Sequence, residues 1–218
     1  AVLRWARFDP ATGELLADPV LARYRDHWNG AIPCQAALAE PLVVATAGGA
    51  VVCCDLAGRV RWVRRQIAVP PPKSLGDALR WLRQVHRRPI VDGRLVHATQ
   101  PGVWGIECMD LDTGELRWRT PLAELIGPAG LLDGRLIAET TTGLIALDPA
   151  DGNILWRHEV PERLDMRVCG GPEGLCYAAV APVEPGGESD GPRQPMLVWV
   201  DPQTGSTTAQ CVLDFAKT

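Results

Sequence analysis

Two adjacent cysteines, Cys53 and Cys54, are the residues whose type and spacing suggest chemistry most directly. Neighbouring thiols can form a vicinal disulfide, but this pair runs straight into Asp55 within an expected β-strand. Successive side chains of a strand point to opposite faces, which is incompatible with an unstrained bridge. The seven cysteines have no zinc-type spacing, and an odd number cannot be fully paired. We therefore expect thiols that pack as small hydrophobic groups.

Carboxylates recur in short polar segments, and one of these, Asp110-x-Asp112-x-Gly114, partly matches a calcium-binding loop. It lacks the third acidic position, the glycine that should follow it and a correctly spaced terminal glutamate. A turn is therefore the preferred interpretation. The four histidines are interpreted as surface or half-buried residues, because they lie in different expected elements. The sequence contains no nucleophile elbow, phosphate-binding loop or dinucleotide fingerprint.

The same polar segment occurs five times along the chain. Each copy starts with an Asp and reaches a Gly four residues later, or three residues later in the second copy. The pairs are Asp9 and Gly13, Asp55 and Gly58, Asp110 and Gly114, Asp148 and Gly152, and Asp201 and Gly205. An Asp carboxylate can accept hydrogen bonds from turn N–H groups, and Gly supplies a positive φ where the chain reverses. Each segment is therefore expected to be a hairpin turn that joins two strands.

A tryptophan follows the Asp of three repeats by seven or eight residues, at Trp62, Trp118 and Trp156. The first and last repeats have Ala17 and Ala209 at this position. A large ring at one recurring position is expected to fill the gap between stacked sheets. An aromatic platform for a ligand is the alternative.

The spacing of the repeats predicts the fold class. The five glycines are 45, 56, 38 and 53 residues apart, and a period of about 40 to 50 residues with strand signals is typical of propeller blades. Further strands are expected beside the turns at Gly48-Gly49, Asp92-Gly93 and Asp133-Gly134. We predict an all-β protein: a β-propeller of four-stranded antiparallel blades, with about four full blades and a partial one, forming a single domain over residues 1–218.

The phrase Asp-x-x-Thr-Gly-x-x-x-Trp, complete from Asp110 to Trp118, resembles the repeat of the quinoprotein-like (PQQ-type repeat) β-propeller family. The resemblance covers nearly the whole chain, and the family's non-catalytic branch includes an outer-membrane assembly lipoprotein. Family members have roughly seven or eight blades, so the chain is either a fragment or a ring closed with fewer blades. The start at Ala1, without Met, also leads us to expect a processed or excised segment.

For the catalytic members, the resemblance implies a pyrroloquinoline quinone (PQQ) under a vicinal disulfide, a calcium ion held by carboxylate and amide groups, and an Asp base. No cluster of Asp, Glu or Asn outside the repeat turns offers such a site. We therefore predict no catalytic residue, no metal site and no cofactor. PQQ and calcium belong only to the alternative interpretation.

A basic insertion, about residues 70–89, separates the second and third repeats. Ten Lys or Arg and only two Asp lie between Arg59 and Arg94, although the whole chain has a net charge of −4. Pro70-Pro71-Pro72 is expected to be an extended spacer, and Ser74 to begin a helix that Pro89 ends. A helix lying on the propeller with solvated arginines is one interpretation. The other is a partner-docking element made of Lys73, Arg80, Trp81, Arg83, Arg87 and Arg88.

The leading functional hypothesis is a non-catalytic scaffold or binding module that mediates protein or ligand interaction. The alternative is a fragment of a PQQ-dependent (quinoprotein) dehydrogenase. The expected partner is a protein or the remaining blades of a larger propeller; nucleic acid is not expected, since the basic footprint is local. No apolar run reaches the roughly 18 residues of a membrane span. Family resemblance implies an extracytoplasmic location, periplasmic or secreted.

Overall fold

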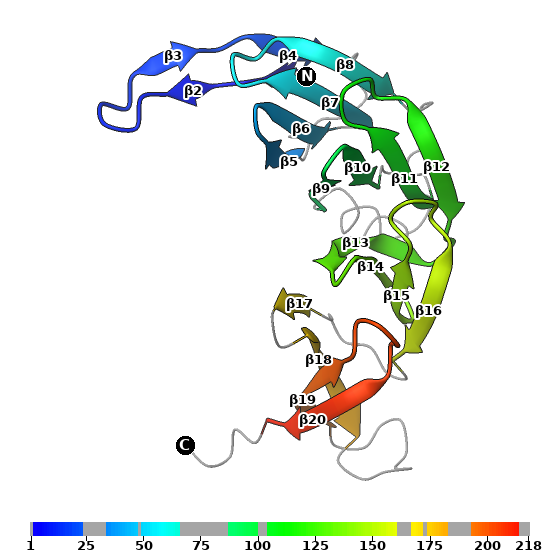
Figure 1. Cartoon of the computed structure of the whole chain (residues 1–218). Helices are drawn as coiled ribbons and strands as arrows, with labels where there is room; N and C mark the ends of the chain where they lie inside the picture. The colour runs from blue at the N-terminus through cyan, green and yellow to red at the C-terminus, as the bar shows by residue number, and fades with distance from the viewer. Residues whose placement is uncertain are drawn as a thin grey trace, which may run out of the picture. The chain divides into compact units, whose positions relative to one another are not determined.

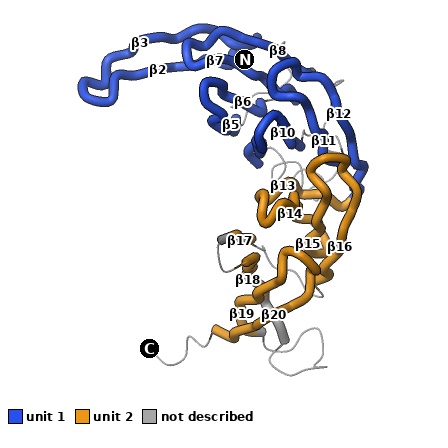
Figure 2. Tube along the Cα trace, viewed as in Figure 1, with its two compact units in different colours: residues 1–123 blue, residues 124–218 orange. Residues whose placement is uncertain are grey.

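The computed structural model describes residues 2–23, 34–47, 49–65, 87–99, 104–160, 167–171, 174–182 and 193–213. These residues form twenty β-strands and no helix. The chain divides into two compact units, Ala1–Ala123 and Glu124–Thr218 (Figure 2). Each unit is described by itself.

Unit 1 begins with a two-stranded N-terminal hairpin, residues 2–23. Both of its long strands are interrupted: β1 (Val2–Arg4) pairs with β4 (Val20–Arg23), and β2 (Arg7–Phe8) pairs with β3 (Leu15–Ala17). In Figure 1 the end that carries β2 and β3 extends beyond the neighbouring strands of the unit. The hairpin therefore corresponds to the partial blade expected at the start of the chain.

Two four-stranded antiparallel sheets complete unit 1 (Figure 1). Sheet I consists of β5 (Cys34–Ala39), β6 (Leu42–Ala47), β7 (Ala50–Asp55) and β8 (Val60–Arg65). Sheet II consists of β9 (Ile90–Asp92), β10 (Leu95–Ala98), β11 (Gly105–Asp110) and β12 (Leu116–Pro121). Each strand pairs with the next one along the chain.

Unit 2 repeats this arrangement twice. Sheet III consists of β13 (Leu125–Leu132), β14 (Arg135–Thr140), β15 (Gly143–Leu147) and β16 (Ile154–Glu159). Sheet IV consists of β17 (Arg167–Gly171), β18 (Gly174–Pro182), β19 (Arg193–Val200) and β20 (Thr207–Val212). Both are antiparallel meanders in chain order.

The middle strands of sheets I, II and III are buried on both faces, whereas the outer strands are partly exposed. Every residue of β6, β11 and β15 is buried, but the exposure of β12 and β16 varies along the strand. Burial on both faces explains why the sequences of these middle strands are nearly continuous runs of apolar residues. Each buried Val, Leu or Ile side chain contributes about 1.5–3 kcal/mol relative to exposure.

Hydrophobic clusters join neighbouring elements within each unit. In unit 1, Leu21 of the N-terminal hairpin packs with Val52 and Cys54 of sheet I, and Trp62 of sheet I packs with Met109 of sheet II. In unit 2 a third cluster joins sheets III and IV; its members include Ile137, Leu144, Trp156, Tyr177 and Val198. Contact between sheet faces is therefore the main source of apolar burial.

The five Asp-to-Gly segments occupy equivalent places in the strand register. In each one the pairing shifts by a bulge between the second and the first residue before the Asp: Arg7/Phe8, Cys53/Cys54, Cys108/Met109, Ala146/Leu147 and Trp199/Val200. A bulge re-aims the strand that carries it, so it is a specific structural feature. Five bulges at one position support the interpretation of the segments as structural repeats.

The all-β prediction with four-stranded sheets and a partial first one is confirmed. The helical insertion at about 70–89 is not: residues 70–86 lie outside the described residues, and residues 87–89 are not helical. The prediction of a single domain over 1–218 stays a prediction.

Candidate functional site

The Asp-to-Gly segments, called corners below, share one hydrogen-bonded geometry that Asp110 illustrates. Its Oδ1 accepts hydrogen bonds from the N–H groups of Asp112 at 3.0 Å and Thr113 at 3.1 Å. The Gly114 N–H donates to the Asp110 carbonyl at 2.8 Å, and the Asp110 N–H donates to the Glu115 carbonyl at 2.9 Å. The aspartate thus closes its own turn.

The other four corners repeat this arrangement. In each, Oδ1 of the aspartate accepts from backbone N–H groups two to four residues later, and the glycine has a φ between 73° and 80°. The aspartates are Asp9, Asp55, Asp148 and Asp201, and the glycines are Gly13, Gly58, Gly152 and Gly205. This φ lies in the left-handed region, where a side chain costs about 1–2 kcal/mol.

Asp110 is also held by an arginine on the returning strand. Arg117 of β12 donates to Asp110 Oδ2 at 2.6 Å, while the Asp110 side chain is almost fully buried. The Arg117 hydrogen bond and the turn N–H groups together lower the pKa of Asp110 to about 2. This carboxylate is therefore ionised at neutral pH and is held by its own turn and by Arg117.

Tryptophan side chains dock on the corners of the sheet that follows. The Trp62 Nε1–H donates to the Leu111 carbonyl at 2.8 Å, and the Trp156 Nε1–H donates to the Pro202 carbonyl at 2.9 Å. Leu111 and Pro202 each come directly after the corner Asp, so the two bonds are equivalent. Each indole fills the gap between two sheets and satisfies a backbone carbonyl there.

The corner glycines are the surface against which these indoles lie. A Cβ added at Gly114 would come within 2.6 Å of the Trp62 ring, and one at Gly205 within 2.7 Å of the Trp156 ring. These positions therefore lack space for any side chain, in addition to having a positive φ.

Gly114→Ala should consequently cost more than the same change at Gly13, whose φ is also 73° but whose added Cβ meets nothing within 4 Å. We expect Gly13→Ala to lower the free energy of unfolding by about 1 kcal/mol through φ alone. Gly114→Ala should lower it by about 2 kcal/mol, because Trp62 must also move. Urea denaturation of both variants measures the difference, and equal losses would contradict the docking role.

Trp5, which the sequence pattern missed, fills the same kind of slot from the N-terminal hairpin. Its Nε1–H donates to the Leu56 carbonyl at 3.2 Å, directly after Asp55, and its ring lies 3.0 Å from a Cβ added at Gly58. Trp5 stands on the first long strand of the hairpin, whereas Trp62 and Trp156 stand on the last strand of a sheet. Ala17, at the expected position, leaves the slot to Trp5.

Trp118 and its neighbour His97 lie on one face of sheet II. In the register, His97 is opposite Cys108 and Cys108 is opposite Trp118. The two rings are 5.6 Å apart between centroids. His97 is completely buried, and among the described residues neither ring nitrogen has a hydrogen-bond partner. Burial lowers the pKa of His97 to about 4, so the ring is neutral at pH 7.

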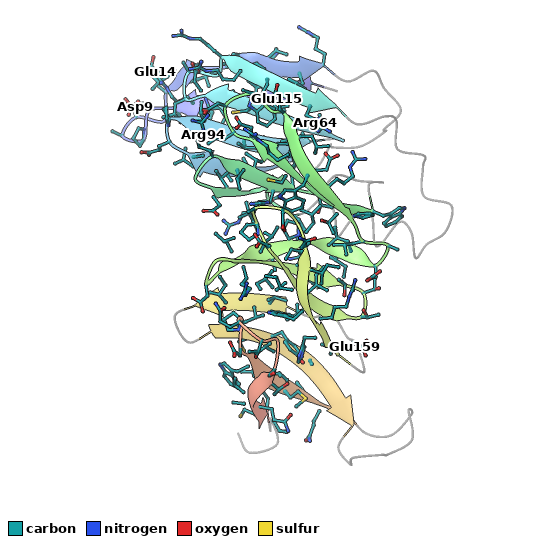
Figure 3. The ribbon with its side chains drawn as sticks, turned by 45° about the vertical axis from the view of Figure 1, so that its right-hand side comes forward. Asp9, Glu14, Arg64, Arg94, Glu115 and Glu159 are labelled. Atoms are coloured by element: carbon teal, nitrogen blue, oxygen red, sulfur yellow. The ribbon has the colours of Figure 1, made fainter. Side chains whose placement is uncertain are left out.

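A buried carboxylate joins sheets I and II. Glu107 of β11 is 1% exposed and pairs with Arg64 of β8 at 3.3 Å and with Arg119 of β12 (Figure 3 labels Arg64). Both guanidinium groups keep partial contact with solvent, which limits the cost of burying charge. The sequence analysis missed this triad because its members are brought together only by strand register.

A histidine–tyrosine pair joins sheets III and IV. His158 Nδ1 lies 2.8 Å from the Gly205 carbonyl, and Nε2 lies 2.9 Å from the Tyr177 hydroxyl. A carbonyl only accepts, so Nδ1 donates to it; in the tautomer that carries its proton on Nδ1, Nε2 accepts from the tyrosine hydroxyl. Burial raises the pKa of Tyr177. His158 therefore acts as a structural bridge between the sheets.

Cys53 and Cys54 face opposite sides of β7. Cys53 belongs to the cluster with Trp62, and Cys54 to the cluster with Leu21. Burial raises the pKa of Cys53 to about 11 and that of Cys108 to about 12, so both stay protonated. Within the described ranges, no three His, Cys, Asp or Glu side chains gather as metal ligands would.

The described part of the basic insertion is limited to Arg87, Arg88 and Pro89. Lys73, Arg80, Trp81 and Arg83 lie outside the described residues. Arg88 is exposed, and the Arg87 carbonyl accepts a long hydrogen bond from the Thr46 hydroxyl at 3.5 Å. A docking role for this segment stays a prediction. No membrane-spanning helix occurs in the part of the chain that the structure describes.

Solved structures with a similar fold share little sequence with the chain. BamB from Moraxella catarrhalis matches with a TM-score of 0.54 and 16% identity, over 81% of this chain and 47% of that one. Hydrazine synthase from Kuenenia stuttgartiensis matches with a TM-score of 0.60 and 12% identity, over 97% and 60%. The Pan2 WD40 domain from Neurospora crassa matches with a TM-score of 0.52 and 14% identity, over 95% and 59%. The chain has the β-propeller fold and spans about half the length of that BamB chain.

Sequence comparison identifies the family. No curated protein matches the chain in sequence. The family model of outer membrane protein assembly factor BamB, however, matches residues 7–158 and, in an overlapping second match, residues 86–216. Because these matches include all five corners, the chain belongs to the BamB-like family of PQQ-type repeat β-propellers.

Proposed function

We propose that the chain is a non-catalytic propeller module that serves as a scaffold or binding surface for a protein partner and uses no cofactor. The observation that carries this proposal is how the repeat uses its polar groups. Asp110 is held by two turn N–H groups and Arg117, and the aspartates of the other corners accept from their own turns. The motif therefore stabilises the sheets and leaves its carboxylates unavailable for a reaction.

The family name supports an assembly role. The matched model is that of an outer membrane protein assembly factor. The same name supports a location outside the cytoplasm. Thiols in that environment are exposed to oxidation, and the burial of Cys53, Cys54 and Cys108 would protect them from it.

The quinoprotein alternative is less well supported. A vicinal disulfide over a quinone requires Cys53 and Cys54 to turn toward each other, yet their side chains pack in two different hydrophobic clusters. Bridging them would remove both thiols from their packing partners and distort β7.

Reconstitution with PQQ and Ca²⁺ tests the proposal. The purified chain is mixed with both, and quinone binding is followed by absorbance and calorimetry, together with dye-linked oxidation of alcohols. We expect no saturable binding and no oxidation, while a quinoprotein alcohol dehydrogenase reconstituted in parallel shows both. Stoichiometric quinone binding with alcohol oxidation would overturn the proposal in favour of an enzyme fragment.

A further inference from the structure

Two cysteines lie directly opposite each other on the first two strands of sheet IV. The register of β17 and β18 pairs Cys169 with Cys176, as the third of five consecutive pairs. This run of pairs contains no bulge, so the register leaves no ambiguity about which residues face each other. The backbone therefore brings two thiol-bearing residues to facing positions within one hairpin.

The spacing of facing residues suits a disulfide. Cα atoms of directly opposite residues in an antiparallel sheet are about 4.5 or 5.5 Å apart, depending on which of the two pair types they form. Cα atoms joined by a disulfide are typically about 4.4–6.8 Å apart. Both pair types fall within this range, so Cys169 and Cys176 can be bridged without moving either strand.

The two cysteine positions also share one face of the sheet. Val168 and Tyr177 are opposite each other, one position along each strand, and both pack in the hydrophobic cluster that joins sheets III and IV. Side chains alternate between the two faces of a strand. Cys169 and Cys176 therefore lie together on the face of sheet IV that is turned away from that cluster.

This facing pair distinguishes sheet IV from the other sheets. At the same register position, sheets I, II and III have Ala37 with Val44, Ile90 with His97, and Gly130 with Ile137. In the strand pairs that the structure describes, each of the remaining cysteines is opposite a residue of another type; these are Cys34, Cys53, Cys54, Cys108 and Cys211. The arrangement is thus specific to one hairpin.

We propose that Cys169 and Cys176 form a cross-strand disulfide that fastens β17 to β18. In the described sheet β17 is an edge strand that pairs only with β18, so the bond secures a strand that is hydrogen-bonded on one side. The argument depends on the register and not on the scaffold function proposed above. A location outside the cytoplasm would supply the oxidising environment in which such a bond persists.

The bond forms by thiol–disulfide exchange with a disulfide-containing oxidant such as glutathione disulfide. The thiolate of one cysteine attacks a sulfur of the oxidant, which gives a mixed disulfide and releases one glutathione. The thiolate of the other cysteine then attacks the protein sulfur of the mixed disulfide and releases the second glutathione. The two thiol protons and two electrons of the cysteines leave with the two reduced glutathiones.

Peptide mapping of the whole chain after equilibration in a glutathione redox buffer tests the bond. The reaction is stopped with acid, and the remaining thiols are alkylated in denaturant. Trypsin releases residues 168–193, whose only cysteines are Cys169 and Cys176, and cleavage after Glu173 separates the two. We expect the two halves to carry no alkyl group, to stay linked without reductant and to separate with it. Cys34 and Cys211 are exposed and should take up glutathione, which shows that the reagent is active.

A comparison with the unfolded chain separates the effect of the register from that of proximity in the sequence. Because the folded hairpin holds the two cysteines together, the native chain should form the bond at a glutathione disulfide concentration at least ~10-fold lower than the chain in urea. Equal concentrations would overturn the proposal. So would a peptide 168–193 that is alkylated at both cysteines when Cys34 and Cys211 carry glutathione.

Amide exchange of β17 measures what the bond does. Oxidation of the wild type should slow exchange in β17 at least ~10-fold, because the bond opposes local opening of the edge strand. Cys176→Ser should show no such change between reducing and oxidising buffer. Cys211→Ser is the matched control, since it removes an exposed thiol of the same sheet and should behave like the wild type. Equal slowing in Cys176→Ser would assign the effect to another group and contradict the proposed bond.

Discussion

Trp62→Ala is expected to lower the free energy of unfolding of unit 1 by about 3–5 kcal/mol, the range for removing a large ring from a core. Trp62 is 9% exposed and packs with Val44, Val51 and Met109 between sheets I and II. The substitution leaves a cavity there and also removes the hydrogen bond to the Leu111 carbonyl. Urea denaturation followed by circular dichroism, with amide exchange of β7 and β11 to identify the unit that unfolds, measures the loss.

Two further variants separate the contributions. Trp62→Phe keeps most of the ring and loses the donor, so it should cost clearly less than Trp62→Ala. Trp104→Ala should cost less than 1 kcal/mol, because that side chain is 42% exposed. If Trp62→Ala and Trp104→Ala lowered the free energy of unfolding equally, the Trp62 indole would not be the main contact between sheets I and II.

Each corner combines a local turn with a contact to the preceding element. Gly114 supplies the φ of 73° that closes the turn around Asp110, and its bare Cα is also the surface on which the Trp62 ring lies. One glycine therefore meets two constraints. This explains how a short motif can fix both the shape of a hairpin and the distance between neighbouring sheets.

The corners could be predicted from sequence because their interactions are local. Asp110 bonds to residues two and three positions later, and the bond that closes its turn spans only five positions, from Asp110 to Glu115. Such short-range bonds recur wherever the residue types recur. The four-stranded sheets follow from the same repeats, because each corner is flanked by strands with a matching apolar pattern.

Residues that act across strands could not be predicted in the same way. Trp5 docks on residues more than fifty positions away and stands on a different strand from the other docking tryptophans. Glu107 meets Arg64 only because sheets I and II stack. Register and stacking bring these groups together, and neither leaves a spacing rule in the sequence.

His97 shows most clearly how a repeat position can be altered. Val44 in sheet I and Ile137 in sheet III stand at the same register position, each opposite the residue that precedes the corner Asp by two. In sheet II that position holds a buried imidazole with no hydrogen-bond partner among the described residues. Its neutral form is tolerated in the core, and its charged form is not.

Unit 1 is therefore expected to lose stability as pH falls from about 6.5 toward 4. In the unfolded chain His97 takes up a proton near its ordinary pKa of 6.5, whereas in the folded chain burial holds its pKa at about 4, with Asp92 opposing the shift slightly. Between these values the unfolded state binds more protons, so the free energy of unfolding decreases with decreasing pH. The full difference corresponds to about 3 kcal/mol, and little of it is lost above pH 6.5.

His97→Ile isolates this effect, because isoleucine is the residue that sheet III has at the same position. The variant should be at least as stable as the wild type at pH 7.5, since it buries no unpaired nitrogen. Its stability should fall much less between pH 6.5 and 5, a range above the ordinary pKa values of the carboxylates. Urea midpoints at several pH values, compared between wild type and variant, measure the difference. Identical pH profiles would mean that His97 is solvated or paired in the folded chain. That result would contradict the assignment of a buried, neutral imidazole.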